Sequence, residues 1–257
     1  MSTPLLEVES VTKTFRRRGG GKLTAVDGIS LYVDRGECVG IVGESGCGKS
    51  TLAQLITRLM SPDSGKIYFC GQELTSCTGA QLRRSYRDMK MIFQEPRSSF
   101  DPRLTLGQSI QEALTPVMSG RKEREAEAGR LLREVGLEAD FAGLYPRQVS
   151  GGECQRAAIA RAIAQKPKLI ICDEATSALD VSVQAQVMEL LSRVRREHNI
   201  AYLFISHDLA LVSSFCDRTY VLRAGRVVEQ GQTAQLIAGP REEYTKRLIS
   251  SVLTVDR

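Results

Sequence analysis

Residues 43–51 have the composition of a phosphate-binding loop. They run Gly-Glu-Ser-Gly-Cys-Gly-Lys-Ser-Thr and fit G-x-x-x-x-G-K-[ST], between an apolar strand pattern and an apolar-periodic helix pattern. The glycines let backbone N–H groups face phosphate oxygens, while Lys49 is expected to reach the β- and γ-phosphates and Ser50 to ligate Mg²⁺. The expected contacts of a nucleoside triphosphate are Gly43, Glu44, Ser45, Gly46, Cys47, Gly48, Lys49, Ser50 and Thr51.

Two adjacent carboxylates end a short apolar segment 124 residues after Lys49. Residues 169–172 have the pattern of a buried strand, and Asp173 and Glu174 follow directly. Asp173 is expected to hold Mg²⁺, and Glu174 to polarise the water that attacks the γ-phosphate. Two acids can also simply mark the end of a strand, but the phosphate loop favours the catalytic interpretation. These residues predict a P-loop NTPase and do not separate kinase from ATPase, or transport from repair.

A capped helix start precedes this strand. Residues 149–156 are Val-Ser-Gly-Gly-Glu-Cys-Gln-Arg. Ser150 as N-cap and Glu153 three residues later predict a capping box, and Gly151 and Gly152 leave the helix N-terminus open to an anion. Taken alone, the segment fits an ordinary well-capped helix equally well.

Four more segments complete a recognisable series. Gln94 follows an apolar strand pattern, residues 177–180 are Ser-Ala-Leu-Asp, His207 follows another apolar strand pattern, and Phe15 stands 28 residues before Gly43. They resemble the Q-loop, D-loop, switch histidine and adenine-stacking aromatic of ABC ATPases, and residues 149–156 resemble the LSGGQ-type signature of the same family. Together with the phosphate loop and the Asp173-Glu174 pair, these motifs stand in the family order. The resemblance covers nearly the whole chain and implies that the nucleotide is ATP.

The resemblance implies a head-to-tail pair of ATPase subunits. Each ATP is then expected between the phosphate loop of one subunit and the signature helix of the other, so that Ser150, Gly151 and Gly152 act in trans. A glycine-flanked helix N-terminus far along the chain from Lys49 agrees with this, because it otherwise lacks a charged ligand. Phe15 is expected to stack on adenine.

The resemblance also implies catalytic roles. Glu174, His207 and Gln94 form the expected catalytic set, with His207 at the γ-phosphate and Gln94 reaching the metal and the attacking water. Ser50, Gln94 and Asp173 are the expected contacts of the Mg²⁺ that accompanies ATP. A lone histidine after a strand is more often structural, but the surrounding motifs favour the catalytic role.

Two departures from the family pattern stand near these sites. The signature begins with Val149 and has Glu153 where glutamine is usual, which puts an acid near the anion site. Glu153 can turn back to the helix cap, so we expect function to persist without an ATP contact from this side chain. Ala175 follows Glu174 where many relatives have proline, a change away from the phosphates.

Two segments indicate a subfamily. Residues 93–103 resemble the F-Q-D-P-x-x-S-L-N-P-R segment, and residues 239–248 the P-x-H-P-Y-T-x-x-L ending, of ATPases that energise dipeptide, oligopeptide and nickel importers. The sequence stops at Arg257 without the longer cysteine-bearing tail of many peptide-importer subunits, which favours the nickel or metallophore branch. The chief alternative is a soluble ABC ATPase that serves an enzyme complex such as carbon-phosphorus lyase.

The implied partners are a second, related ATPase subunit, two transmembrane permease subunits and, indirectly, an extracytoplasmic solute-binding protein. The chain is expected as a peripheral protein on the cytoplasmic face of the membrane. Residues 95–103 hold two prolines, two arginines and Phe100, a poor composition for a helix or strand. We expect this segment, with Phe100 exposed, to contact the permease beside Gln94.

The elements that position these residues predict an α/β fold. We expect the P-loop NTPase fold of ABC ATPases in one domain, residues 1–257. A mostly parallel sheet and an N-terminal antiparallel β subdomain take residues 1–93 and 165–257, and an inserted helical subdomain takes about 104–164. The expected strands are 5–11, 25–33, 37–43, 66–70, 89–93, 169–172, 201–205, 219–222 and 226–229; the expected helices are 49–60, 153–164, 181–198, 209–215, 233–238 and 242–251.

The composition is that of an ordinary globular protein. Of 257 residues, 42% are hydrophobic and 25% charged, with a net charge of +5. Five per cent aromatic residues and no tryptophan supply few base-stacking platforms, and no nucleic-acid partner is expected. No run approaches the roughly 18 apolar residues of a membrane span. Seven scattered cysteines and two histidines indicate neither a disulfide framework nor a metal-ligand cluster.

Overall fold

A six-stranded sheet forms the centre of the computed structural model, which describes residues 3–16 and 20–253. Five strands are parallel, and β10 pairs antiparallel with β9 at one edge. This confirms the mostly parallel core sheet. In spatial order the strands are β10 (Arg226–Gln232), β9 (Arg218–Arg223), β3 (Cys38–Val42), β8 (Ala201–Ser206), β7 (Leu169–Asp173) and β6 (Met89–Ile92).

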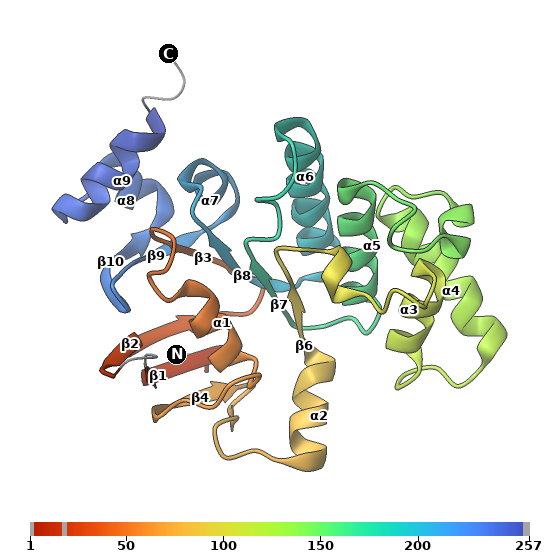
Figure 1. Ribbon diagram of the computed structural model, residues 1–257, viewed down its shortest axis with the longest axis horizontal. Coiled ribbons are helices and arrows are strands. Elements are labelled where there is room, and N and C mark those ends of the chain that lie inside the picture. The colour runs from red at the N-terminus through yellow and green to blue at the C-terminus, as the bar shows by residue number, and fades with distance from the viewer. Residues whose placement is uncertain (1–2, 17–19, 254–257) are drawn as a thin grey trace.

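A second, antiparallel sheet lies beside the first (Figure 1). Its two long strands pair from Leu6 opposite Val33 to Arg16 opposite Lys22, with register shifts on the way. Their antiparallel pairing agrees with the expected N-terminal β subdomain. In spatial order the strands are β2 (Lys22–Val33), β1 (Leu6–Arg16), β4 (Ser64–Phe69) and β5 (Gln72–Glu73).

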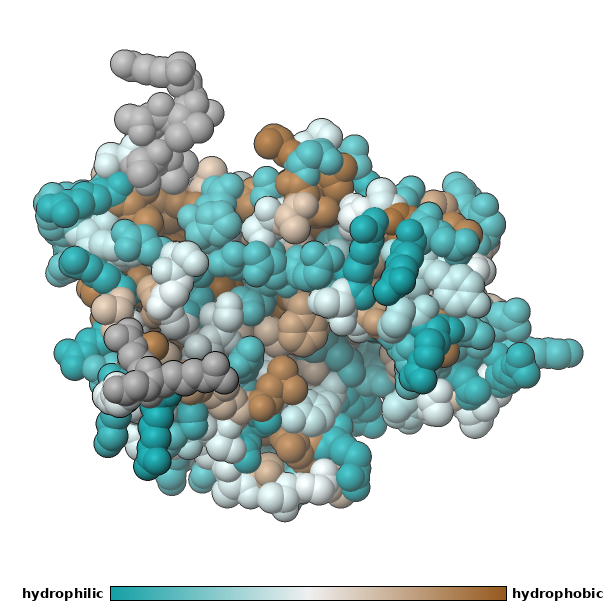
Figure 2. Space-filling view, in the orientation of Figure 1, coloured by the Kyte–Doolittle hydropathy of each residue, from teal (hydrophilic) through white to brown (hydrophobic). Residues whose placement is uncertain are grey.

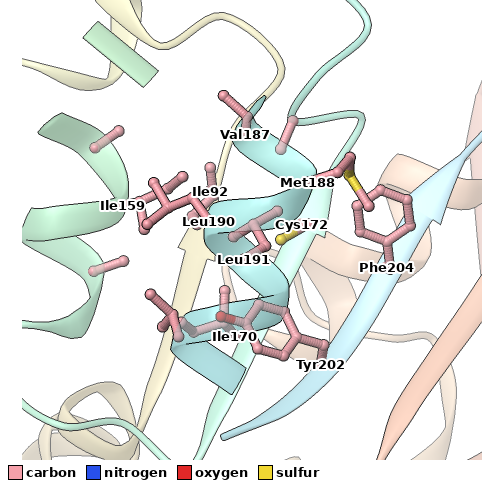
Figure 3. Packing of buried hydrophobic residues seen from close by; sticks show 14 of the residues in the cluster. Ile92, Ile159, Ile170, Cys172, Val187, Met188, Leu190, Leu191, Tyr202 and Phe204 are labelled. Atoms are coloured by element: carbon pink, nitrogen blue, oxygen red, sulfur yellow. The ribbon is translucent and has the colours of Figure 1, made fainter. Parts of the chain in front are cut away.

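Alternate side chains of the central strands enter two separate cores. On β8, Tyr202 and Phe204 pack with α5 (Gly151–Ile163) and α6 (Val181–His198), as Figure 3 shows for β8 and α6. Leu203 and Ile205 face the other way, into a core shared with α1 (Lys49–Ile56) and the antiparallel sheet. Burial on both faces explains why the parallel strands are continuous apolar runs.

Helices on the right of Figure 1 form a group inserted between β6 and β7. It contains α3 (Leu106–Leu114), α4 (Arg121–Glu134) and α5, with 3-10 turns η1 (Arg97–Ser99) and η2 (Ala139–Gly143). Apolar residues of α3 and α4 belong to the same core cluster as α6 and β7. The helical group is therefore packed directly onto the sheet. The remaining helices are α2 (Gly79–Asp88), α7 (Leu209–Phe215), α8 (Thr233–Ala238) and α9 (Glu243–Leu253).

The structure differs from the sequence predictions in three places. Helix α1 ends at Ile56 and not at Met60, because the backbone reverses at Arg58 (φ 57°). Helix α2 was not predicted. Phe100 is buried and not exposed, at 4% exposure, with the Arg161 guanidinium carbon 4.1 Å from its ring centroid.

The cysteines of the chain are free thiols, and all except Cys70 are buried. Within the described part of the chain, we find no helix with the length and apolarity needed to cross a bilayer. On the face drawn in Figure 2, apolar surface is broken into small groups among hydrophilic residues.

Candidate active site

The phosphate loop joins β3 to α1 and is packed tightly from behind. A Cβ on Gly48 would lie 2.1 Å from the Ala25 carbonyl oxygen, and one on Gly43 would lie 2.3 Å from the Leu222 carbonyl oxygen. Gly48 also has φ +109°. Only glycine fits these two positions, because backbone from β2 and β9 approaches too closely for a side chain.

Lys49 lies inside this loop. Its side chain is 4% exposed, and its Nζ donates hydrogen bonds to the carbonyl oxygens of Gly43 at 2.8 Å and Glu44 at 3.0 Å. The same nitrogen lies 3.6 Å from Glu174 Oε1. The loop thus surrounds the Lys49 ammonium group, and the carboxylate next to that group belongs to Glu174, the expected general base.

Ser50 and Asp173 meet beside Lys49. The Ser50 Oγ donates a hydrogen bond to Asp173 Oδ1 at 3.0 Å. Burial raises the pKa of Asp173, the hydrogen bond from Ser50 and the charge of Lys49 oppose that rise, and the Glu174 charge adds to it. The fold thus joins the two residues that the sequence expects to share a magnesium ion, although they lie 123 positions apart.

Glu174 and His207 stand at the ends of neighbouring parallel strands. Asp173 of β7 is in register with Ile205 of β8, so the residues that follow emerge at the same edge of the sheet. His207 Nδ1 lies 3.4 Å from Glu174 Oε2. The two carboxylate oxygens of Glu174 therefore face two different nitrogen groups, those of Lys49 and His207.

Gln94 and Phe15 lie near this cluster without joining it. Gln94 is exposed and follows β6. It lies at the carboxyl edge of the sheet, because β6 runs parallel to β7 with Ile92 opposite Cys172. Among the described residues, no hydrogen bond or ion pair links Gln94 to Lys49 or Glu174. Phe15 is half-buried on β1, opposite Leu23 of the strand that also touches Gly48.

The signature segment forms the start of α5, in the helical group. The Ser150 Oγ accepts from the Glu153 N–H at 3.3 Å, and the Glu153 carboxylate accepts from the Ser150 N–H at 2.7 Å, which confirms the capping box. The hydrogen bond from the Ser150 N–H to the carboxylate lowers the pKa of Glu153. The glutamate departure is thus a cap residue, and its charge is turned back onto its own helix.

The two signature glycines differ in their surroundings. A Cβ on Gly152 would lie 2.4 Å from Val183 Cγ1, whereas one on Gly151 would lie 3.6 Å from Leu179 Cδ2, an ordinary contact. Gly152 is required by packing within the chain. Gly151 carries no such constraint.

The D-loop connects Glu174 to α6. The Ser177 Oγ donates to the Glu174 carbonyl oxygen at 3.0 Å, and Asp180 is the N-cap of α6, accepting from the Val183 N–H at 3.0 Å. Val181, which follows, is 83% exposed. The segment holds the backbone of Glu174 at one end and presents an apolar side chain to solvent at the other.

Comparison with known proteins decides the family. Residues 26–177 match the family model described as ABC transporter. The chain belongs to the ABC transporter family. This ABC protein is an ATP-binding, ATP-hydrolysing subunit.

Curated relatives match this ABC ATPase along almost its whole length. It is 46% identical to a probable peptide ABC transporter ATP-binding protein of Sinorhizobium fredii, over 100% of this chain and 74% of the relative. It is 44% identical to an oligopeptide transport ATP-binding protein of Bacillus subtilis, over 96% and 78% of the two chains. A glutathione import ATP-binding protein of Pectobacterium atrosepticum is 42% identical over 98% of this chain, which spans 42% of that relative.

Solved structures agree on the fold of this ABC ATPase. A dimeric ATP-binding cassette in a post-hydrolysis state with ADP and Pi gives a TM-score of 0.79 at 31% identity, covering 89% of this chain and 98% of that one. A subunit of the CbiONQ ABC transporter complex from Clostridium perfringens gives 0.80 at 26% identity, covering 99% and 98%.

One group of potential metal ligands, absent from the expectations, arises from the fold. Glu134 of α4 and Glu197 and His198 of α6 bring ligand atoms within 4.8 Å of one another. Glu134 Oε1 lies 2.6 Å from His198 Nε2, so two of the three side chains are already within hydrogen-bond distance of each other. No regular spacing in the sequence reveals it, because its members come from two helices.

Proposed function

We propose that this ABC ATPase binds ATP with Mg²⁺ at the phosphate loop and hydrolyses it with Glu174 as general base, to power peptide import through a membrane permease. The observation that carries the proposal is the position of Glu174, with Lys49 3.6 Å from one carboxylate oxygen and His207 3.4 Å from the other. A γ-phosphate held by those two nitrogens would place its attacking water beside the carboxylate.

Each residue of the cluster has a proposed task. Lys49 stabilises charge on the β- and γ-phosphates, Glu174 accepts the proton of the attacking water, and His207 donates a hydrogen bond to the γ-phosphate. Ser50 and Asp173 fit Mg²⁺, because hydroxyl and carboxylate oxygens are the ligands it prefers. When bound, that ion neutralises phosphate charge.

Further residues outside the cluster complete the proposed site. The exposed Gln94 reaches the metal and the water from the edge of β6, and Phe15 stacks on adenine. The open side of Gly151 leaves the α5 N-terminus free for a phosphate bound to a second subunit. These features support a head-to-tail pair in which Ser150, Gly151 and Gly152 act in trans.

The proposed cargo is a peptide. The names of the curated relatives given above include peptide, oligopeptide and glutathione transport, and these favour a peptide over nickel or a metallophore. The proposed assembly has two permease subunits, a second ATPase subunit and an extracytoplasmic solute-binding protein. The chain would then lie on the cytoplasmic face of the membrane.

A groove beside α2 is the proposed permease contact, in place of the buried Phe100. It encloses about 440 Å³ and is lined by Ala80, Arg83, Arg84, Tyr86, Arg87, Lys90, Pro116 and Gln165. Lys90 donates to the Tyr86 carbonyl at 2.6 Å and to Gln165 Oε1 at 2.7 Å, and burial lowers its pKa to about 8. Cations around an apolar groove suit a permease segment that carries both acidic and apolar side chains.

Co-purification and reconstitution test the proposed function. A tagged chain should bring down permease subunits from membranes, and the complex in liposomes should hydrolyse ATP faster when di- to pentapeptides and the binding protein are added. Nickel chloride should give no such stimulation. Co-purification with soluble lyase subunits and no permease would contradict the proposal and support the accessory-ATPase alternative.

A further inference from the structure

The first turn of α9 lies against the phosphate loop. Tyr244 is 8% exposed, and its hydroxyl accepts a hydrogen bond from the Glu44 backbone N–H at 3.1 Å. The residues are 200 positions apart. The sequence places Tyr244 within the subfamily segment 239–248 without assigning it a task.

The hydrogen bond to Tyr244 and a hydrogen bond from Lys49 involve the same peptide unit, the one between Gly43 and Glu44. The N–H of Glu44 and the carbonyl of Gly43 belong to one planar trans peptide, so they point in opposite directions. On one side the N–H is bound by Tyr244; on the other, the carbonyl accepts from Lys49 Nζ at 2.8 Å. Fixing the N–H therefore fixes the carbonyl that orients the lysine.

Neighbouring C-terminal residues contact the same phosphate loop, and one of them also contacts Tyr244. The Gly225 N–H donates to the Cys47 carbonyl at 2.9 Å, and the Leu222 carbonyl lies directly behind Gly43. The Arg223 guanidinium carbon lies 5.0 Å from the Tyr244 ring centroid. The back wall of the phosphate loop is thus built from β9, the turn after it and α9.

The N–H bound by Tyr244 is not one that the helix start offers to phosphate. Helix geometry leaves the N–H groups of Lys49, Ser50 and Thr51 without intrahelical acceptors, and Gly48 provides no side-chain cap. Those groups face the site from the other end of the loop. Tyr244 therefore holds Glu44 in the nucleotide-free loop without occupying any of those three N–H groups.

We propose that Tyr244 is a positioning residue for the nucleotide site, acting through the Gly43–Glu44 peptide on Lys49, so that α9 sets the affinity for ATP. The inference rests on the proposed role of Lys49.

The test is Tyr244→Phe in the full chain, with Mg-ATP affinity measured by calorimetry and KM and kcat measured in the assembled transporter. Without this bond the free loop is no longer held in the binding geometry, so ATP binding must restore that geometry, and Kd and KM should rise by up to roughly fivefold, the equivalent of one hydrogen bond of about 1 kcal/mol. The kcat should stay within about twofold, because the catalytic carboxylate is untouched. Exchange of the Glu44 amide hydrogen should quicken in nucleotide-free protein.

Tyr202→Phe is the matched control, because the Tyr202 hydroxyl is buried without a hydrogen-bond partner among the described residues. It should leave KM and Glu44 exchange unchanged. Wild-type KM in Tyr244→Phe, or a fall in kcat alone, would overturn the inference. Lys49→Ala separates the two proposals: if it bound ATP normally, the phosphate-loop role itself would fail, whatever Tyr244→Phe did.

Discussion

Glu174 has a backbone conformation that few glutamates adopt. Its φ is +49°, a region disfavoured for residues with a Cβ. Its N–H donates to the Ile205 carbonyl at 3.0 Å, and its carbonyl accepts from the Ser177 N–H at 3.1 Å. A disfavoured conformation persists where the surroundings fix it from both sides, and such residues gather at functional sites. The strand end thus aims the carboxylate between Lys49 and His207.

Asp173→Asn should stabilise the nucleotide-free protein and abolish hydrolysis. Burial raises the pKa of Asp173, so the folded state binds its proton more tightly than the unfolded state, and stability falls as pH rises through the two pKa values. The variant removes this loss at neutral pH. Its melting temperature should exceed that of the wild type, by about 2–4 °C for each kcal/mol gained.

Thermal melts of both proteins from acid to neutral pH check this prediction. The difference in melting temperature between the variant and the wild type should disappear in acid, where Asp173 is protonated in the folded and unfolded states alike. A variant less stable than the wild type at neutral pH would show that the Ser50 bond outweighs burial.

At the scale of elements, the two signature glycines should separate in their effects. Gly151→Ala should fold normally and leave ATP binding to the isolated subunit unchanged, since its Cβ meets only an ordinary contact. Gly152→Ala should destabilise the chain by about 1–3 kcal/mol, because Val183 blocks the new methyl group. Denaturant unfolding measures both, and equal stability of the two variants would contradict the packing argument.

Gly151→Glu tests the trans role of the same helix. A bulky acid at this open position should spare nucleotide binding by the monomer and block ATP-driven dimerisation, because its charge would face the phosphates of the second subunit. Light scattering with and without Mg-ATP reads the outcome. Loss of ATP binding by the monomer would indicate a role within one subunit.

Phe100→Asp should cost about 3–5 kcal/mol of folding stability, because it removes a buried ring and buries a carboxylate. Phe93→Asp is the matched control, since Phe93 is 37% exposed. It should cost clearly less stability than Phe100→Asp, because more of the Phe93 ring is already in water. A stable Phe100→Asp protein that fails only in transport would restore Phe100 as the permease contact.

The sequence predicts an element well where the residues that start, end and bury it lie within the element or next to it. The helix predicted over residues 181–198 has the observed bounds. It begins after the N-cap Asp180 and ends before the C-cap Asn199, whose backbone is in the left-handed region. Helix α2 was missed because its one buried residue is Ser85, so it has no apolar stripe to detect. Phe100 packs in the core among residues far along the chain and contacts Arg161, 61 positions later, and no local pattern contains these contacts.

The site divides in the same way. Motif spacing predicted Lys49, Ser50, Asp173 and Glu174, and the family resemblance added His207. The parallel sheet brings them together because β3, β7 and β8 are neighbours. The Tyr244 contact was not predicted, since it depends on where α9 packs.

At the scale of the whole molecule, the groove beside α2 should carry the permease contact. Arg83→Glu with Arg84→Glu reverses two exposed charges on its rim. ATP binding should persist, while permease association weakens about tenfold or more, as expected when like charges face each other across an interface. Arg133→Glu on α4 is the control, and pull-down from membranes is the measurement. Unchanged association would place the contact elsewhere.

The central claim is that Glu174 is the base that drives ATP turnover in the assembled transporter. Its most direct measurement is the turnover of Glu174→Gln beside Glu153→Gln, the same change at a carboxylate that only caps its own helix. Glu174→Gln should retain ATP binding within about threefold and lose roughly 100-fold or more in kcat, the scale of general-base catalysis. Glu153→Gln should turn over like the wild type. Wild-type turnover by Glu174→Gln would contradict the account.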